Sequence, residues 1–421
     1  MSTRPPSADV LHHHPRQMRG RDTEEAYRVS TQLELLFDLT FATSFSFAAS
    51  QLASALAGGQ YAAAWLGFGF ASSAICWAWS NFSWFSSAYD TDDWIFRVVT
   101  MVQMIGVLVL AIGLPRMFAS VERGEHLDNS IIVLGYVIMR VALVFQWLRA
   151  ANQDPARRRA CLTYALATSI AQVGWVTQLV THFSPGVTLP FSGSLVIVEF
   201  LGPVLAERTY GGTPWHAAHI AERYGLFAII ALGEGVVGTV AALSAVVEVQ
   251  GWTLDAALVG IAGTGITFAM WWLYNLLPSA QFLRRHRDRA FVWGFGQMMI
   301  VTSVVSIGAG LRVAAYVVEH KANISPFTTV MSVAVPVGAF LGLMYALYYY
   351  LVRHFHLFQL WLLIATAAVM VVTVIAARSG ISMARCLVIL MLAPTVTVVG
   401  YELLGYRHHM EALTGAPRAV Q

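Results

Sequence analysis

The chain has 421 residues, of which 57% are hydrophobic and only 12% are charged, and its formal net charge is +3. About a quarter of the residues in an average soluble domain are charged, so this composition excludes an ordinary soluble protein. The net charge is small and spread over loops, which excludes the basic surface that nucleic-acid binding requires.

Apolar runs of roughly 20 residues, the length that crosses a bilayer as a helix, recur along almost the whole chain. Glycine, proline and charged residues mark the breaks between these runs. The pattern predicts an all-α, polytopic membrane protein with about twelve transmembrane helices, for which the lipid bilayer is the solvent. The predicted spans are 31–57, 61–85, 94–118, 127–150, 160–182, 188–205, 221–247, 252–277, 290–315, 326–351, 355–377 and 380–404.

The polar ends and loops predict the orientation. Residues 1–30 contain no apolar segment of a cleaved signal peptide, and we interpret them, with His12–His14, as a disordered cytoplasmic tail. With this tail inside the cell, 19 of the 26 Lys and Arg residues lie on the cytoplasmic side, six lie outside and Arg140 falls within a span. This asymmetry predicts two cytoplasmic termini and a multi-pass protein of the cell (plasma) membrane.

Motifs of cofactor or metal chemistry are missing from the sequence. Cys76, Cys161 and Cys386 are isolated and form no CxxC pair, which indicates neither a disulfide nor a metal site. There is no P-loop, Rossmann fingerprint or GxSxG elbow. We therefore predict no cofactor and no metal, and the lack of a long soluble domain argues against an ATP-driven pump.

The two halves of the chain resemble each other at positions 188 to 194 residues apart. This spacing predicts a parallel six-plus-six repeat, an arrangement that secondary transporters use with a site between the halves. The matching pairs are Glu34 with Glu222, Trp77–Asn81 with Trp271–Asn275, Gln103 with Gln297, and Leu201–Pro203 with Leu392–Pro394. The predicted divisions are a tail (1–30), a first half (31–205), a cytoplasmic connecting loop (206–220), a second half (221–405) and a cytoplasmic tail (406–421).

Three stretches carry a family resemblance. The helix beginning "LELLFDLTFA", the loop "DTDD" and the segment "HAAHIAERYGLFAIIALGEGV" resemble the bacterial low temperature requirement A (LtrA) family over roughly residues 30 to 405. This family is named from a cold-growth phenotype, and the resemblance implies a multi-pass membrane architecture. The chain keeps the carboxylates of the family motifs, but it has Leu36, Thr40 and Gly235 where Phe, Val and Ser are usual.

Two carboxylates lie one helical turn apart at the start of the first span. Glu34 forms a capping box with Thr31 in the pattern "TQLE", which competes with a functional role. Asp38 is too deep in the span for a cap, so we assign it to an ion pair or a proton pathway.

A broad polar stripe opens the seventh span. If the helix starts early, His216, His219 and Glu222 face inward from the cytoplasm with Glu234. The spacing is compatible with a proton-conducting stripe, with ordinary interfacial residues or, least specifically, with a metal site.

Glu234 is the deepest carboxylate of the sequence and lies close to the bilayer centre by helical rise. A carboxylate there must be protonated, paired or in contact with water. Arg140 is the candidate partner, although it could equally pair with Asp38 or Glu199. Ser46 stands at the equivalent depth of the first span, so the two halves are not equal.

Further candidates lie near the cytoplasmic entrance and in the spans. Asp90, Asp92 and Asp93 either complement the dipole of the following helix or bind a cation or basic loops. Gln103 and Gln297 are candidate cavity-lining residues. The aromatic residues Trp77, Trp79, Trp271 and Trp272 form either an interfacial belt or a wall for an apolar ligand.

These features favour a transporter or permease of a small molecule, coupled to protons through Glu234 and Asp38. One alternative is a membrane-embedded enzyme that uses a carboxylic acid as general acid on a lipid- or isoprenoid-like substrate. Another is a proton or ion channel, which rests on analogy between folds.

Overall fold

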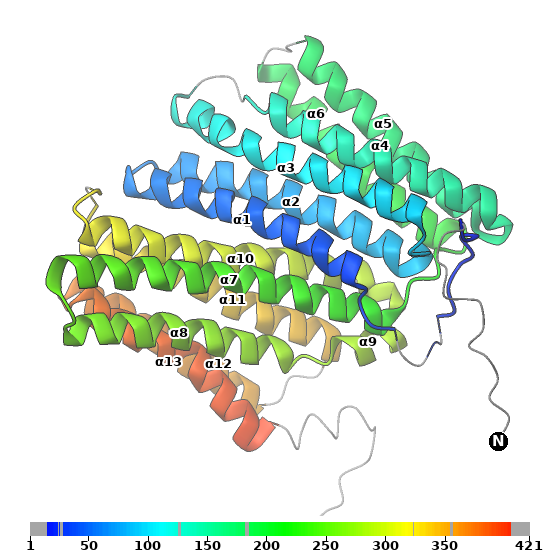
Figure 1. Cartoon of the computed structure of the whole chain (residues 1–421). Helices are drawn as coiled ribbons and strands as arrows, with labels where there is room; N and C mark the ends of the chain where they lie inside the picture. Colours follow the sequence, from blue (N-terminus) through cyan, green and yellow to red (C-terminus); the bar gives the residue numbers. More distant parts are fainter. Residues whose placement is uncertain are drawn as a thin grey trace, which may run out of the picture. The chain divides into compact units, whose positions relative to one another are not determined.

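The computed structural model describes residues 15–23, 25, 28–124, 128–181, 185–322, 324–353 and 357–405, and every regular element in these ranges is helical (Figure 1). Twelve helices are long. They are α1 (Gln32–Ala57), α2 (Tyr61–Tyr89), α3 (Trp94–Glu122), α4 (Ser130–Gln153), α5 (Arg158–Thr181), α6 (Pro185–Thr209), α7 (Ala217–Gln250), α8 (Leu254–Asn275), α10 (Ala290–Val318), α11 (Pro326–Val352), α12 (Leu357–Arg378) and α13 (Met383–Gly400).

Ten helices in the described ranges are long and apolar enough to cross a membrane, which confirms the all-α, polytopic membrane fold. Each of the twelve predicted spans overlaps one long helix. The two long helices that are not among these ten are α1, which contains two carboxylates, and α5, which begins with two arginines. The short helix α9 (Ser279–Arg285) lies in a segment that the sequence indicated as a polar break.

The chain forms two compact units. The first contains the described residues of Met1–Ser44 and Ala74–Arg223, and the second contains those of Phe45–Ser73 and Tyr224–Gln421. Helices α1, α2 and α7 therefore contribute to both units. The predicted division into halves 31–205 and 221–405, and the repeat itself, stay predictions.

In the first unit, α3, α4, α5 and α6 pack in chain order, each on the next (Figure 1). Gly106 and Gly135 allow α3 and α4 to approach closely, because a Cβ on either residue would collide with the backbone of the other helix. In the second unit, α10 packs on α11, and α13 packs on α8, α11 and α12.

An irregular segment precedes α1 in the first unit, and we call its described residues between 15 and 31 the N-terminal strap. The amide of Met18 donates to Gln153 Oε1 (2.7 Å), and the guanidinium of Arg28 donates to the carbonyl of Ser86 at the end of α2 (2.6 Å). Met18 is fully buried. The predicted disorder of residues 1–30 stays a prediction for residues 1–14, including His12–His14, which lie outside the described residues.

Candidate functional site

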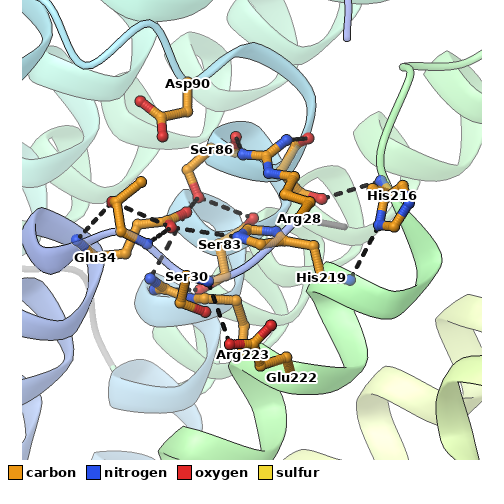
Figure 2. A network of polar contacts seen from close by, with 12 residues as sticks. Arg28, Ser30, Glu34, Ser83, Ser86, Asp90, His216, His219, Glu222 and Arg223 are labelled. Atoms are coloured by element: carbon orange, nitrogen blue, oxygen red, sulfur yellow. Dashed lines mark hydrogen bonds and ion pairs between the residues drawn. The ribbon is translucent and has the colours of Figure 1, made fainter. Parts of the chain in front are cut away.

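Polar side chains from the beginnings of α1 and α7 and from the end of α2 meet inside the first unit (Figure 2). All are fully buried. We call this set the charge network: Glu34 and Asp38 of α1, Ser83 and Ser86 of α2, and His219 and Arg223 of α7.

Glu34 lies at the centre of the charge network. Its carboxylate accepts a hydrogen bond from the amide of Thr31 (2.8 Å), and the Thr31 hydroxyl accepts from the amide of Glu34 (3.2 Å), which is the predicted capping box. The same carboxylate also accepts from Ser86 Oγ (2.6 Å) and from His219 Nε2 (3.2 Å). Glu34 therefore takes part in the capping box and in the charge network at the same time.

Arg223 connects the two carboxylates of α1. Its Nη2 donates to Asp38 Oδ1 at 2.7 Å, and its Nη1 lies 3.7 Å from Glu34 Oε1. Trp79 also donates to Asp38 Oδ1, from its indole nitrogen (2.7 Å), and Ser83 accepts from the arginine (3.2 Å). Arg223 is thus shared between two anionic partners.

The charge network contains hydrogen-bonding atoms that other described residues do not satisfy. These atoms are Asp38 Oδ2, His219 Nδ1, Arg223 Nε and Arg223 Nη1. Buried polar atoms are normally hydrogen-bonded, because leaving one without a partner costs about 1–3 kcal/mol. Of these atoms, Asp38 Oδ2 and His219 Nδ1 can accept a proton next to the charges of the network, whereas the arginine nitrogens can only donate.

A second layer of contacts joins this network to the N-terminal strap. His216 precedes α7 and caps it, because its Nδ1 accepts from the amide of His219 (3.2 Å) while its Nε2 donates to the carbonyl of Glu25 (2.9 Å). Glu222 accepts from the amide of Ser30 (3.2 Å). Burial lowers the pKa of Arg28 to about 10, which leaves it charged at neutral pH.

These contacts bear on the metal alternative for His216, His219 and Glu222. Both ring nitrogens of His216 are engaged with protein groups. No group of three His, Cys, Asp or Glu side chains within the described ranges is arranged to hold a metal ion.

The three aspartates of the loop between α2 and α3 have different partners. Asp93 caps α3 by accepting from the amide of Phe96 (2.8 Å), and it pairs with Arg149. Asp92 forms two 2.8 Å contacts with Arg97. Asp90 accepts from the amide of Asp92 (2.8 Å), and burial raises the pKa of its carboxyl to about 6.

A separate polar cluster surrounds Glu199 of α6, also within the first unit. Its carboxylate accepts from the indole of Trp77 (2.5 Å), the hydroxyl of Tyr136 (2.7 Å) and the indole of Trp175 (3.2 Å). Arg140 lies 3.5 Å from it. Of the three partners considered for Arg140, the structure thus selects Glu199.

Glu234 has a different partner, in the second unit. Arg312 of α10 donates to Glu234 Oε2 at 2.6 Å and to Ser46 Oγ at 3.3 Å. Arg312 is one of the six cations that the sequence assigned to the outer side of the membrane, and it lies within α10. A Cβ on Gly308 would collide with the carbonyl of Glu234, so α7 and α10 are in close contact at this pair.

The remaining predicted residues are not members of the charge network. Gln103 donates to Gln146 (3.1 Å), and Gln297 is fully buried on α10. Trp271 and Trp272 of the second unit are 40% and 37% exposed, as expected of residues near an interface.

Sequence reasoning missed Arg223, Arg312, Ser83 and Ser86 as site residues. Arg223, at the start of the predicted span 221–247, is one of the 19 cations that the sequence assigned to the cytoplasmic side. One signal was available: Arg223 follows His219 by four residues, which places both side chains on the same face of α7.

Comparisons with known proteins found one family model and one bacterial protein with similar sequences. A sequence model described as "Bacterial low temperature requirement A protein (LtrA)" matches residues 29–394, a range that contains the whole charge network. "Uncharacterized protein RA0937" of Rhizobium meliloti (strain 1021) is 24% identical over 323 residues, covering 73% of this chain and 74% of that protein. No solved structure matches the chain significantly.

Proposed function

The chain belongs to the bacterial low temperature requirement A (LtrA) family, and we propose that it is a proton-coupled secondary transporter of the cell membrane. The observation that supports this proposal is the buried Arg223, which contacts both Asp38 and Glu34. Its substrate is a small solute, and the charge network of α1 and α7 couples solute movement to protons.

The coupling follows from electrostatics at low dielectric. Asp38 and Glu34 carry two negative charges when ionised, and Arg223 and the neighbouring Arg28 carry two positive ones. A charge that loses its partner inside a protein costs several kcal/mol. Protonation of Asp38 would therefore release Arg223 toward Glu34, and the contact between α1 and α7 would change with it.

We propose that protons reach the network from the side of Asp90 and the N-terminal strap. Asp90 and the strap lie on that side, Ser86 contacts Glu34, and Glu34 lies about 6 Å along α1 from Asp38, since each residue rises 1.5 Å. His219, with Nε2 on Glu34 and an unsatisfied Nδ1, is placed to exchange a proton with this carboxylate. The expected cytoplasmic location of both termini would place this end inside the cell.

Proton movement in proteoliposomes tests the proposal. Purified protein is reconstituted with a trapped pH-sensitive dye, and solutes are added by class: amino acids, carboxylic acids, sugars, amines and monovalent cations. We expect at least one class to produce saturable proton movement in the wild type, and Asp38→Asn to reduce it by about tenfold or more. Asparagine keeps the acceptor for Trp79 but cannot carry the proton.

Asp255→Asn is the matched control, because Asp255 is an ionisable residue in the first turn of α8 and lies outside the charge network. Proton movement that is the same in Asp38→Asn and in the control would contradict coupling through Asp38. Non-saturating current without any solute would instead favour the channel, and product formation in detergent, without a gradient, would favour the enzyme.

A further inference from the structure

Several helix ends of the second unit meet around α9, the short helix between α8 and α10 (Figure 1). Arg289, just before α10, donates to the carbonyl of Leu351 near the end of α11 (2.8 Å). Trp272 of α8 donates to Glu402, which follows α13 (2.9 Å). The ends of α8, α11 and α13 therefore lie on the same side of the unit as the start of α10, and we call this side the α9 end.

The α9 end carries an excess of positive charge. Its charged residues within the described ranges are five arginines and two acids, which gives a net charge of +3: Arg284, Arg285, Arg287, Arg289, Arg353, Asp288 and Glu402. The opposite end of the same unit is balanced, with three cations and three acids: Lys321, Arg378, Arg385, Glu248, Asp255 and Glu319. The asymmetry places the positive charge of the second unit at one end only.

Two of these arginines are available to a ligand. Arg284 and Arg353 are exposed, and neither pairs with a carboxylate among the described residues. Arg289 is engaged with the carbonyl of Leu351, and Arg285 and Arg287 take part in other interactions. The available guanidinium groups thus come from α9 and from the residue that follows α11.

Exposed aromatic side chains surround the α9 end. Trp271 and Trp272 lie near the end of α8, Tyr349 lies in the last turn of α11, and Trp361, which is 62% exposed, lies in the second turn of α12. Trp and Tyr are enriched at the level of the lipid headgroups. Leu283 is fully buried and fixes α9 at this level, so the arginines lie beside the headgroups.

A narrow apolar groove of about 60 Å³ lies at the α9 end. The ends of α8, α11 and α13 and the start of α12 form its walls, with Leu276 and Leu277 just before α9. Tyr345 and Thr397 also line the groove, but their hydroxyl groups hydrogen-bond to each other (3.2 Å). The volume is that of about two water molecules at ~30 Å³ each, so the groove takes part of a hydrocarbon chain and no hydrated headgroup.

We propose that the α9 end binds an anionic phospholipid, with the phosphate beside Arg284 and Arg353 and part of one acyl chain in the groove. Guanidinium groups form paired, charge-assisted hydrogen bonds with phosphate, and a cluster of basic residues next to a membrane helix attracts anionic lipids. A soluble phosphate would gain nothing from the apolar walls, so the charge and the groove together favour a lipid.

Native mass spectrometry of the full-length protein in a neutral detergent tests this site. Phosphatidylglycerol and phosphatidylcholine with the same acyl chains are titrated separately, and the fraction of protein with one bound lipid gives each affinity. We expect the wild type to prefer phosphatidylglycerol about 25-fold, at about fivefold for each of the two arginines, because the choline group cancels the phosphate charge of the other lipid. The double variant Arg284→Gln/Arg353→Gln should lose nearly all of this preference.

Arg158→Gln/Arg159→Gln is the charge-matched control, since both arginines are exposed at the start of α5 in the first unit. This control should keep the preference of the wild type. Equal affinities for the two lipids in the wild type would overturn the proposal. An equal loss of preference in the two double variants would also overturn it, because the lipid would then respond only to the general charge of the protein.

The role of the groove is tested with glycerol 1-phosphate, which has the phosphate but no acyl chain. We expect it to leave bound phosphatidylglycerol in place at about tenfold excess, because it lacks the buried methylene groups. Displacement at concentrations equal to that of the lipid would show a site for a soluble anion and contradict the assignment of the groove. These measurements use no gradient, so their outcome does not depend on the transport proposal.

Discussion

Arg223 and Arg312 both contact carboxylates within the long helices, and the surroundings of these two contacts differ. In the first unit, Arg223 is shared between Asp38 and Glu34. In the second unit, Arg312 pairs with Glu234, and Gly308 is pressed against the backbone of Glu234. A shared arginine has a second anionic partner when one carboxylate gains a proton. A one-to-one pair in close helix packing can only break, so we interpret it as structural.

The sharpest test of this difference is the loss of the shared arginine. Arg223→Met leaves both Glu34 and Asp38 buried without their cation, and breaking a buried pair costs about 3–5 kcal/mol. We expect a loss near the upper end of this range, measured by unfolding in detergent. Either Glu34→Gln or Asp38→Asn alone should restore only part of the stability, and both together should restore most of it. Full rescue by one of them would contradict the shared arrangement.

The pair of the second unit should behave differently. Arg312→Met is expected to cost about 3–4 kcal/mol of stability, because only Glu234 loses its cation. One second substitution, Glu234→Gln, should then recover most of the loss, and this double variant should retain proton-coupled transport. A double variant that is stable but inactive would show that Glu234 takes part in coupling, as the sequence suggested.

Replacing Asp90 should change the stability by less than the two arginine substitutions do, and it should raise the stability instead of lowering it. Burial raises the pKa of this carboxyl from 3.8 to about 6, so the folded state holds the proton more tightly than the unfolded state. The wild type therefore loses stability as pH rises through this window, by up to about 3 kcal/mol at 1.36 kcal/mol for each pKa unit. Asp90→Asn should be more stable than the wild type at pH 8, and the difference should vanish near pH 4. Equal melting temperatures at pH 8 would contradict this result.

The smallest expected effect concerns a hydrogen bond of the network. Ser86→Ala removes the donor to Glu34 Oε1 and should cost about 1–2 kcal/mol, because the carboxylate keeps its contacts with Thr31 and His219. Ser73→Ala is the control, since the Ser73 hydroxyl is exposed and donates to the carbonyl of Gly69 in its own helix. A loss no larger than that of the control would show that Glu34 does not depend on Ser86.

Local patterns predicted some parts of the site well. The capping box of Glu34 involves residues three positions apart, and the cap of α3 by Asp93 follows from an acidic residue just before a helix. The partners of the deep carboxylates were not predictable in this way. Arg140 was considered for three carboxylates, and nothing in the residue order distinguishes Glu199 from Asp38 or Glu234.

The apolar runs of the sequence are enough to predict the helices, their number and the membrane environment. A backbone in lipid must satisfy its hydrogen bonds internally, so an apolar run of sufficient length becomes a helix whatever its neighbours are. The contacts of Asp38 with Arg223, 185 residues later in the chain, and of Glu234 with Arg312 are visible only in the folded structure. Such contacts depend on which helices pack together and on how each is rotated about its axis. Residues far apart in the sequence do not encode that rotation locally.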